Sequence, residues 1–159
     1  MNWRYLYTRF DGRIPRRTYW LASIPLWIVM VTIGTVEYAW TDGFSRVAEP
    51  GYRLVLFLVG LAMWYPTSAV VVKRLHDRDR DGRLVLILIA PFLLFYLYDL
   101  LGWSNPSNPK TVEDVLAVLT LVVGLVFLVE LGFRRGTAGP NQYGPDPLAS
   151  PAPAARAPA

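Results

Sequence analysis

The sequence VVKRLHDRDRDGRL, residues 71–84, decides the fold, because it places a dense group of charges between two of the most apolar stretches of the chain. Five basic residues, three aspartates and the only histidine fall between Lys73 and Arg83. The whole chain is 53% hydrophobic and 18% charged, which leaves too little polar surface for a soluble globule of 159 residues. We therefore predict an integral membrane protein in which this stretch connects two membrane spans.

Four apolar runs are candidate spans, at about residues 18–40, 53–72, 84–103 and 112–133. Each has close to the ~20 residues that an α-helix needs to cross the ~30 Å hydrocarbon core. The last two contain shorter uncharged segments, residues 84–98 and 115–129. An interfacial or re-entrant hairpin is therefore the alternative to two crossings for this pair.

The distribution of basic residues favours four crossings and sets the orientation. If all four runs cross, thirteen of the sixteen Lys and Arg residues share one side, and only Arg46, Arg53 and Lys110 lie on the other. Because cytoplasmic connections hold the excess of Lys and Arg, we expect both termini and the 73–83 connection to be cytoplasmic.

The two ends of the chain differ in character. Trp3, Leu6, Tyr7 and Phe10 recur at helical spacing, which predicts a short amphipathic helix on the inner membrane surface. Residues 148–159 are rich in Ala and Pro, and we expect a disordered tail there. The predicted fold is thus all-α: a membrane domain over residues 1–147, formed by a four-helix bundle with an N-terminal interfacial helix.

Three segments of the sequence resemble a known family. They contain Phe10, Gly12, Arg13, Arg16 and Trp20, then Arg74, Leu75, His76, Asp77 and Gly82, and finally GTAGPNQYGPDP at 136–147. In this order they resemble the signature segments of the YhaH-like small bacterial inner-membrane proteins, domain of unknown function 805. The resemblance implies a multi-span bacterial inner-membrane protein with these segments on the cytoplasmic side, and it supplies no reaction. The chain departs from the pattern at Asp79 and Asp81, which make the segment more acidic.

The charged residues of the first two segments form a predicted cytoplasmic polar cluster of Arg13, Arg16, Arg74, His76 and Asp77. We expect charge-assisted hydrogen bonds by which Arg74, His76 and Asp77 tie the second and third spans to the N-terminal arginines or to the C-terminal turns, with Asp77 paired to Arg13 or Arg16. The catalytic alternative is an acid/base pair of His76 and Asp77. Adjacent residues on a helix point about 100° apart, and no nucleophile motif, zinc spacing or phosphate loop accompanies them. We therefore predict no catalytic residues and no enzyme.

A cation site is a weaker alternative for the same stretch. Asp77, Asp79, Asp81 and Gly82 match the first half of a calcium-binding loop, but the twelfth position, which should carry a bidentate acid, is Leu88. We therefore expect neither a metal nor another cofactor.

Three acids near the span ends remain, Glu37, Asp99 and Glu130. We favour pairing at the membrane interfaces, and a proton or cation path is the alternative. The expected function is accordingly that of a non-catalytic binding or scaffold protein whose basic cytoplasmic face engages anionic lipid or a protein partner, a second copy included. Nucleic acid is not an expected partner, because the basic residues flank apolar runs. A small oligomeric transporter or channel for ions or small solutes is the alternative function.

Overall fold

The structure is a computed structural model that describes residues 2–40, 50–103 and 111–149, apart from the side chains of Glu37, Tyr38 and Trp40. These residues form helices and turns, with an isolated β-bridge between Asn141 and Gly144 and no strand in the described ranges. The all-α prediction is therefore confirmed. The predicted connections at 41–49 and 104–110 and most of the predicted tail, 150–159, lie outside the described residues.

The helices follow the predicted apolar runs closely. They are α1 (Trp3–Thr8), α2 (Arg16–Trp40), α3 (Pro50–Asp77), the 3₁₀ turn η1 (Gly82–Leu84), α4 (Val85–Leu100), α5 (Thr111–Phe127) and the π-helical turn η2 (Leu128–Phe133). Four segments are long and apolar enough to cross a membrane: Arg16–Val36, Pro50–Asp77, Gly82–Leu100 and Thr111–Phe133. Acidic residues Glu113 and Asp114 occupy the first turn of α5, where they complement the helix dipole.

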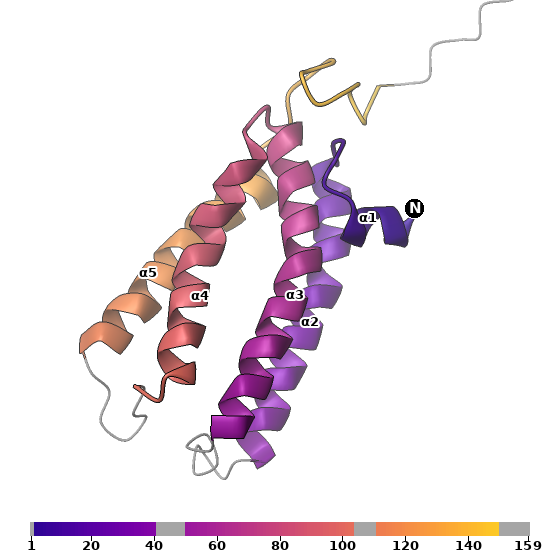
Figure 1. Cartoon of the computed structure of the whole chain (residues 1–159). Helices are drawn as coiled ribbons and strands as arrows, with labels where there is room; N and C mark the ends of the chain where they lie inside the picture. The colour runs from indigo at the N-terminus through magenta and orange to yellow at the C-terminus, as the bar shows by residue number, and fades with distance from the viewer. Residues whose placement is uncertain (1, 41–49, 104–110, 150–159) are drawn as a thin grey trace, which may run out of the picture.

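The long helices form two hairpins that meet at one end (Figure 1). Helices α2 and α3 pack together, as do α4 and α5, and α3 contacts α4. Helix α2 packs against η2, at the end of the bundle that carries Arg13, Arg74 and Asp77, which we call the charged end. Away from the charged end the two hairpins diverge (Figure 1). The short helix α1 lies across the bundle and packs on α3 (Figure 1).

The tightly packed core lies near the charged end. Its buried residues include Leu6 of α1, Ala22 of α2, Val70 and Leu75 of α3, and Leu131 of η2. Helix α5 has no buried residue. Many large apolar side chains of α5 are exposed, and so are many on the part of α2 farther from the charged end. This exposure is expected of helices that contact lipid.

The structure corrects the picture of residues 73–83 as a surface connection. Helix α3 continues five residues past the predicted span end at Val72, and Lys73, Arg74 and Asp77 are buried. The helix continues because the polar groups of these residues bind the chain's own backbone and one another, so that they need no contact with water.

Candidate functional site

Asp77, the last residue of α3, lies at the centre of a buried ionic cluster. Its carboxylate accepts hydrogen bonds from Arg13 Nε at 3.3 Å and from Arg74 Nη1, and Arg13 Nη2 lies 3.2 Å away. The side chains of Arg13, Arg74 and Asp77 are 1%, 0% and 4% exposed. A carboxylate between two guanidinium groups neutralises only one of the two positive charges, so the rest of the charge must be solvated by other groups of the protein.

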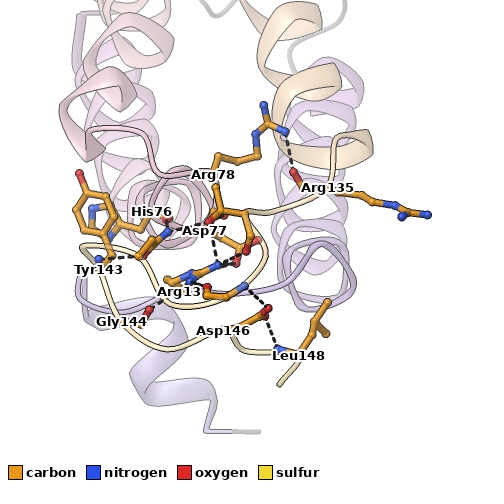
Figure 2. Close-up of polar contacts among 12 residues, drawn as sticks. Arg13, His76, Asp77, Arg78, Arg135, Tyr143, Gly144, Asp146 and Leu148 are labelled. Carbon is orange, nitrogen blue, oxygen red and sulfur yellow. Dashed lines mark hydrogen bonds and ion pairs between the residues drawn. The ribbon is translucent and has the colours of Figure 1, made fainter. Parts of the chain in front are cut away.

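Backbone carbonyls of the C-terminal segment solvate Arg13. Its Nη1 donates to Gly139 O at 2.8 Å and Gly144 O at 3.2 Å, and its Nη2 donates to Thr137 O at 2.7 Å and Thr137 Oγ1 at 3.1 Å. With the bond from Nε to Asp77, these acceptors use the five N–H groups of the guanidinium. Figure 2 shows the guanidinium of Arg13 lying between α3 and the C-terminal loop. Arg13 therefore fastens the segment before α2 to the last described segment of the chain.

Arg74 likewise donates hydrogen bonds to backbone carbonyls, at the end of the last helix. Its Nε donates to Leu131 O at 2.7 Å, and its Nη2 donates to Arg134 O at 2.5 Å. The last carbonyls of a helix lack partners within it, and a π-helical turn shifts the remaining bonds further. Trp20 of α2 binds another of these carbonyls: its Nε1 donates to Gly132 O at 3.0 Å. Side chains of α2 and α3 thus cap η2.

The C-terminal segment also binds the end of α3 directly. The Thr137 backbone N–H donates to Asp77 O at 2.8 Å, and Asn141 Nδ2 donates to His76 O at 2.9 Å. Gly136 passes so close to Asp77 that a Cβ on it would lie 2.1 Å from Oδ2, which explains why this position is glycine. The Asp146 carboxylate accepts from the Leu148 and Gly139 backbone N–H groups, which lower its pKa below the usual value.

Lys73 is a member of the cluster that the sequence analysis did not single out. Its side chain is fully buried, donates to Tyr5 O at 3.2 Å and to Arg9 O, and lies 5.0 Å from the centre of the Tyr5 ring. A signal for it was present, because Lys73 precedes Asp77 by four residues and so shares its helix face. Through Lys73, α1 and the segment after it are attached to α3.

His76 and Asp77 point to different partners. His76 Nδ1 lies 3.2 Å from Gly12 O, and its ring stacks on Tyr143 with centroids 3.8 Å apart and planes within 5°. Figure 2 shows the imidazole beside Tyr143, away from the carboxylate of Asp77. The structure thus places His76 in packing contacts between three segments.

The structure does not bring the remaining predicted residues to the same point. Arg16 is exposed, and its Nη1 lies 3.5 Å from Phe133 O, so Arg13 is the partner of Asp77. Asp79 accepts from Gln142 Nε2 at 3.2 Å, and Asp81 caps η1 by accepting from the Arg83 N–H at 2.8 Å. Within the described ranges no three Asp, Glu or His side chains gather in a way that could hold a metal ion.

The three acids near the span ends are separated as well. Glu130 forms ion pairs at the charged end with Arg78, at 3.0 Å, and with Arg134. Asp99 lies near the other end of the bundle, where its carbonyl accepts from Arg53 Nη1 at 3.0 Å. The Glu37 side chain lies outside the described residues. The described contacts of Glu130 therefore form a local ion-pair network and do not extend along the bundle.

A hollow of about 320 Å³ lies beside the cluster, and its lining includes Arg16 and Arg135 as well as the carboxylates Asp77 and Asp146. Figure 2 shows the Arg135 side chain directed away from Asp77, while its carbonyl accepts from Arg78 Nη1 at 2.8 Å. The inner cluster is thus a structural tie whose side-chain nitrogens have partners within the chain, whereas the side chains of Arg16 and Arg135 are exposed.

Comparison with known proteins identifies relatives along almost the whole chain. The profile of a family described as "Protein of unknown function (DUF805)" matches residues 7–145. Among curated proteins of Escherichia coli K12, the chain is 32% identical to "Uncharacterized protein YiiR" over 86% of this chain and 84% of that protein. It is 30% identical to "Inner membrane protein YhaI" (89% and 87%) and 25% identical to "Inner membrane protein YhaH" (91% and 92%). No solved structure matches.

Proposed function

The chain belongs to the DUF805 family of proteins of unknown function. We propose that it is a non-catalytic inner-membrane protein whose cytoplasmic arginines bind anionic lipid head groups. Two observations support the membrane setting: the similarity to proteins named as inner-membrane proteins, and the four apolar helices. The lipid-binding assignment is a step beyond these features and rests on the arginines.

The observation that carries the proposal is the division of the basic residues into two groups. Arg13, Lys73 and Arg74 are buried, and carbonyls and Asp77 of the same chain take their donors. Each side-chain nitrogen of these three residues has a partner within the chain, and this supports a structural role for the cluster. A second group has exposed side chains: Arg4, Arg9, Arg16, Arg17, Arg80, Arg83, Arg134 and Arg135. Among these, Arg9, Arg83 and Arg134 form ion pairs with Asp11, Asp81 and Glu130.

Exposed arginines that surround the end of a membrane helix bundle attract anionic lipid. Each Lys or Arg near an anionic membrane surface contributes about 1 kcal/mol of attraction. A guanidinium can also bind a phosphate oxygen pair through two parallel hydrogen bonds. Arg16 and Arg135 suit this role best, because both line the hollow beside the cluster.

The proposal requires the charged end to be cytoplasmic, with both termini on that side. The ratio of thirteen basic residues to three supports this orientation. The natural chain has no cysteine, so single cysteines can report the side of the membrane directly. We expect Ala138→Cys to react with a membrane-impermeant maleimide only in inverted vesicles, and Ser107→Cys only in intact spheroplasts. The reverse pattern would refute the orientation.

Lipid selectivity tests the binding itself. Each lipid is added in turn to the purified protein. Native mass spectrometry then compares the amount of phosphatidylglycerol that the protein retains with the amount of phosphatidylcholine. Removing two of the proposed head-group contacts, in Arg16→Gln/Arg135→Gln, should cost about 2 kcal/mol, or roughly 30-fold in preference for phosphatidylglycerol. The matched control Arg46→Gln/Lys110→Gln removes two charges from the predicted opposite side and should keep the preference. Equal loss in both variants would reject the assignment.

Transport is not proposed, because no observation favours it. Glu130 is engaged by Arg78 and Arg134 at the charged end, and Asp99 lies toward the other end of the bundle. A relay between acids needs groups within hydrogen-bond reach of one another or of connecting water.

A further inference from the structure

An apolar groove of about 600 Å³ opens on the side of the bundle where the hairpins diverge. Trp27 of α2 forms one wall, and residues of α4 and α5, including Phe92, Leu121 and Gly124, form the other. The groove exists because α2 packs against η2 at the charged end, while α5 leans away from it with α4 (Figure 1). Its size is within the range of small-molecule binding sites.

The groove does not end at the surface of the bundle. It shares Trp27, Phe92, Gly124 and Leu128 with a second hollow of about 270 Å³ between the four long helices. This inner hollow extends toward the charged end, where Tyr19 and Val71 line it. A flexible hydrocarbon could therefore lie along the groove with part of its length enclosed.

The length of the groove fits an acyl chain. On α5 and η2 its lining runs from Ala117 to Leu128, a rise of about 17 Å at 1.5 Å per residue. An acyl chain of one leaflet occupies about half of the ~30 Å hydrocarbon core, or about 15 Å. The lining is centred on the middle of the Thr111–Phe133 span, and its Leu128 end is the one nearer the charged end.

The polarity along the same seam changes as it does along a lipid. The Trp27 ring contacts Trp20 with centroids 5.9 Å apart, and Trp20 contacts Phe133 with centroids 5.7 Å apart. The next group toward the charged end is Arg16, whose Nη1 lies 3.5 Å from Phe133 O. Apolar groove, aromatic seam and cation thus follow one another in the order of an acyl chain, the interface and an anionic head group.

We propose that the groove binds one acyl chain of an anionic phospholipid, with the head group at Arg16 and Arg135. The position of the head group rests on the proposed function, whereas the acyl-chain site rests on the groove alone. A transmembrane helix of a second copy would contact α4 and α5 over the ~30 Å of the core, nearly twice the length of the groove. The length of the groove and the order of apolar lining, aromatic seam and Arg16 favour the lipid.

Two glycines provide a matched test. A Cβ at Gly124, which lines both hollows, or at Gly34 of α2, which lines neither, would meet nothing within 4 Å. Leucine at either position also improves helix propensity, so both variants should fold. With dioleoyl phosphatidylglycerol as the probe in native mass spectrometry, we expect Gly124→Leu to reduce lipid retention at least tenfold and Gly34→Leu to stay within twofold of the natural chain.

A second measurement reports where the acyl chain of the lipid lies. Phosphatidylglycerol brominated in mid-chain should quench part of the tryptophan fluorescence. That part should shrink in Trp27→Phe, with the remainder coming from Trp64 and Trp20, and it should also shrink in Gly124→Leu. Equal retention and equal quenching in Gly124→Leu and the natural chain would overturn the acyl-chain site. It would also be overturned if Gly124→Leu converted a dimer into a monomer with lipid retention unchanged, since the groove would then be an interface between copies.

The outcomes separate this inference from the proposed function. If Arg16→Gln/Arg135→Gln loses lipid selectivity while Gly124→Leu retains lipid, the head-group assignment stands and the groove site is wrong. If Gly124→Leu loses both phosphatidylglycerol and phosphatidylcholine while the arginine variant keeps its selectivity, the groove binds acyl chains and the head-group assignment is wrong.

Discussion

Replacing Asp77 by Asn should be among the most destabilising polar substitutions in this chain. The carboxylate is the acidic partner of two guanidinium groups whose side chains are 1% and 0% exposed. Removing one partner of a buried ion pair leaves an uncompensated charge and typically costs about 3–5 kcal/mol. The amide keeps one oxygen for three donors and directs its own N–H₂ toward a cation. We therefore expect a loss in the upper half of that range.

The assay is reversible unfolding of the purified protein in mild detergent by added SDS, followed by circular dichroism at the helix band. The matched control is Asp79→Asn, which removes the same charge two residues away. Asp79 is exposed and has φ of 54°, a left-handed conformation that Asn also tolerates, so its loss should stay within about 0.5 kcal/mol.

A double-mutant cycle with Arg13→Gln then measures the pair itself. Asp77→Asn leaves two buried guanidinium groups without a carboxylate, whereas Arg13→Gln leaves Asp77 paired with Arg74 alone. In the double variant one buried charge, that of Arg74, lacks a counter-charge, instead of two in Asp77→Asn. We expect the double variant to be less destabilised than the sum of the singles by about 1–3 kcal/mol. Additive losses, or equal stability of Asp77→Asn and Asp79→Asn, would refute the buried ionic tie.

Three further substitutions test the surroundings of this tie. Gly136→Ala places a Cβ 2.1 Å from Asp77 Oδ2 and should cost about 1–3 kcal/mol in the same SDS titration; an unchanged titration would contradict the close approach. Trp20→Phe removes the bond to Gly132 O and should cost about 1 kcal/mol, a loss that Trp20→Tyr should not recover. Lys73→Met releases the Tyr5 and Arg9 carbonyls, so hydrogen exchange should rise in α1 and not in α4; uniform exchange would argue against a local fastening.

The helices could be predicted because hydrophobic run length and charge are local properties of the sequence. The uncharged run before Lys73 is long enough to predict a membrane helix. Pro66 within it is compatible with that prediction, because membrane helices tolerate proline, and α3 is indeed one continuous helix. The end of α3 could not be placed in the same way. Whether Lys73 and Arg74 reach water or remain buried depends on carbonyls more than fifty residues away along the chain.

The sequence narrowed the ion-pair partner of Asp77 to two candidates. Charge complementarity limited it to Arg13 or Arg16, three residues apart, and local patterns did not distinguish them. The structure distinguishes them by backbone acceptors: Thr137, Gly139 and Gly144 surround the guanidinium of Arg13, while Arg16 stays exposed on the first turn of α2. The role of the C-terminal turns as acceptors has no signature in charge or hydropathy, which is why the resemblance located them and composition did not.

The attachment of Arg13 to residues 137–144 has a consequence for biosynthesis. A ribosome makes Arg13 at least 124 residues before its acceptors Thr137, Gly139 and Gly144, so the bonds of this cation form only after the four apolar helices have been synthesised. Insertion of the apolar helices into the bilayer thus precedes closure of the tie. A nascent chain that stops short of Gly136 leaves the guanidinium without these acceptors, and quality-control proteases would meet it as an unfinished product.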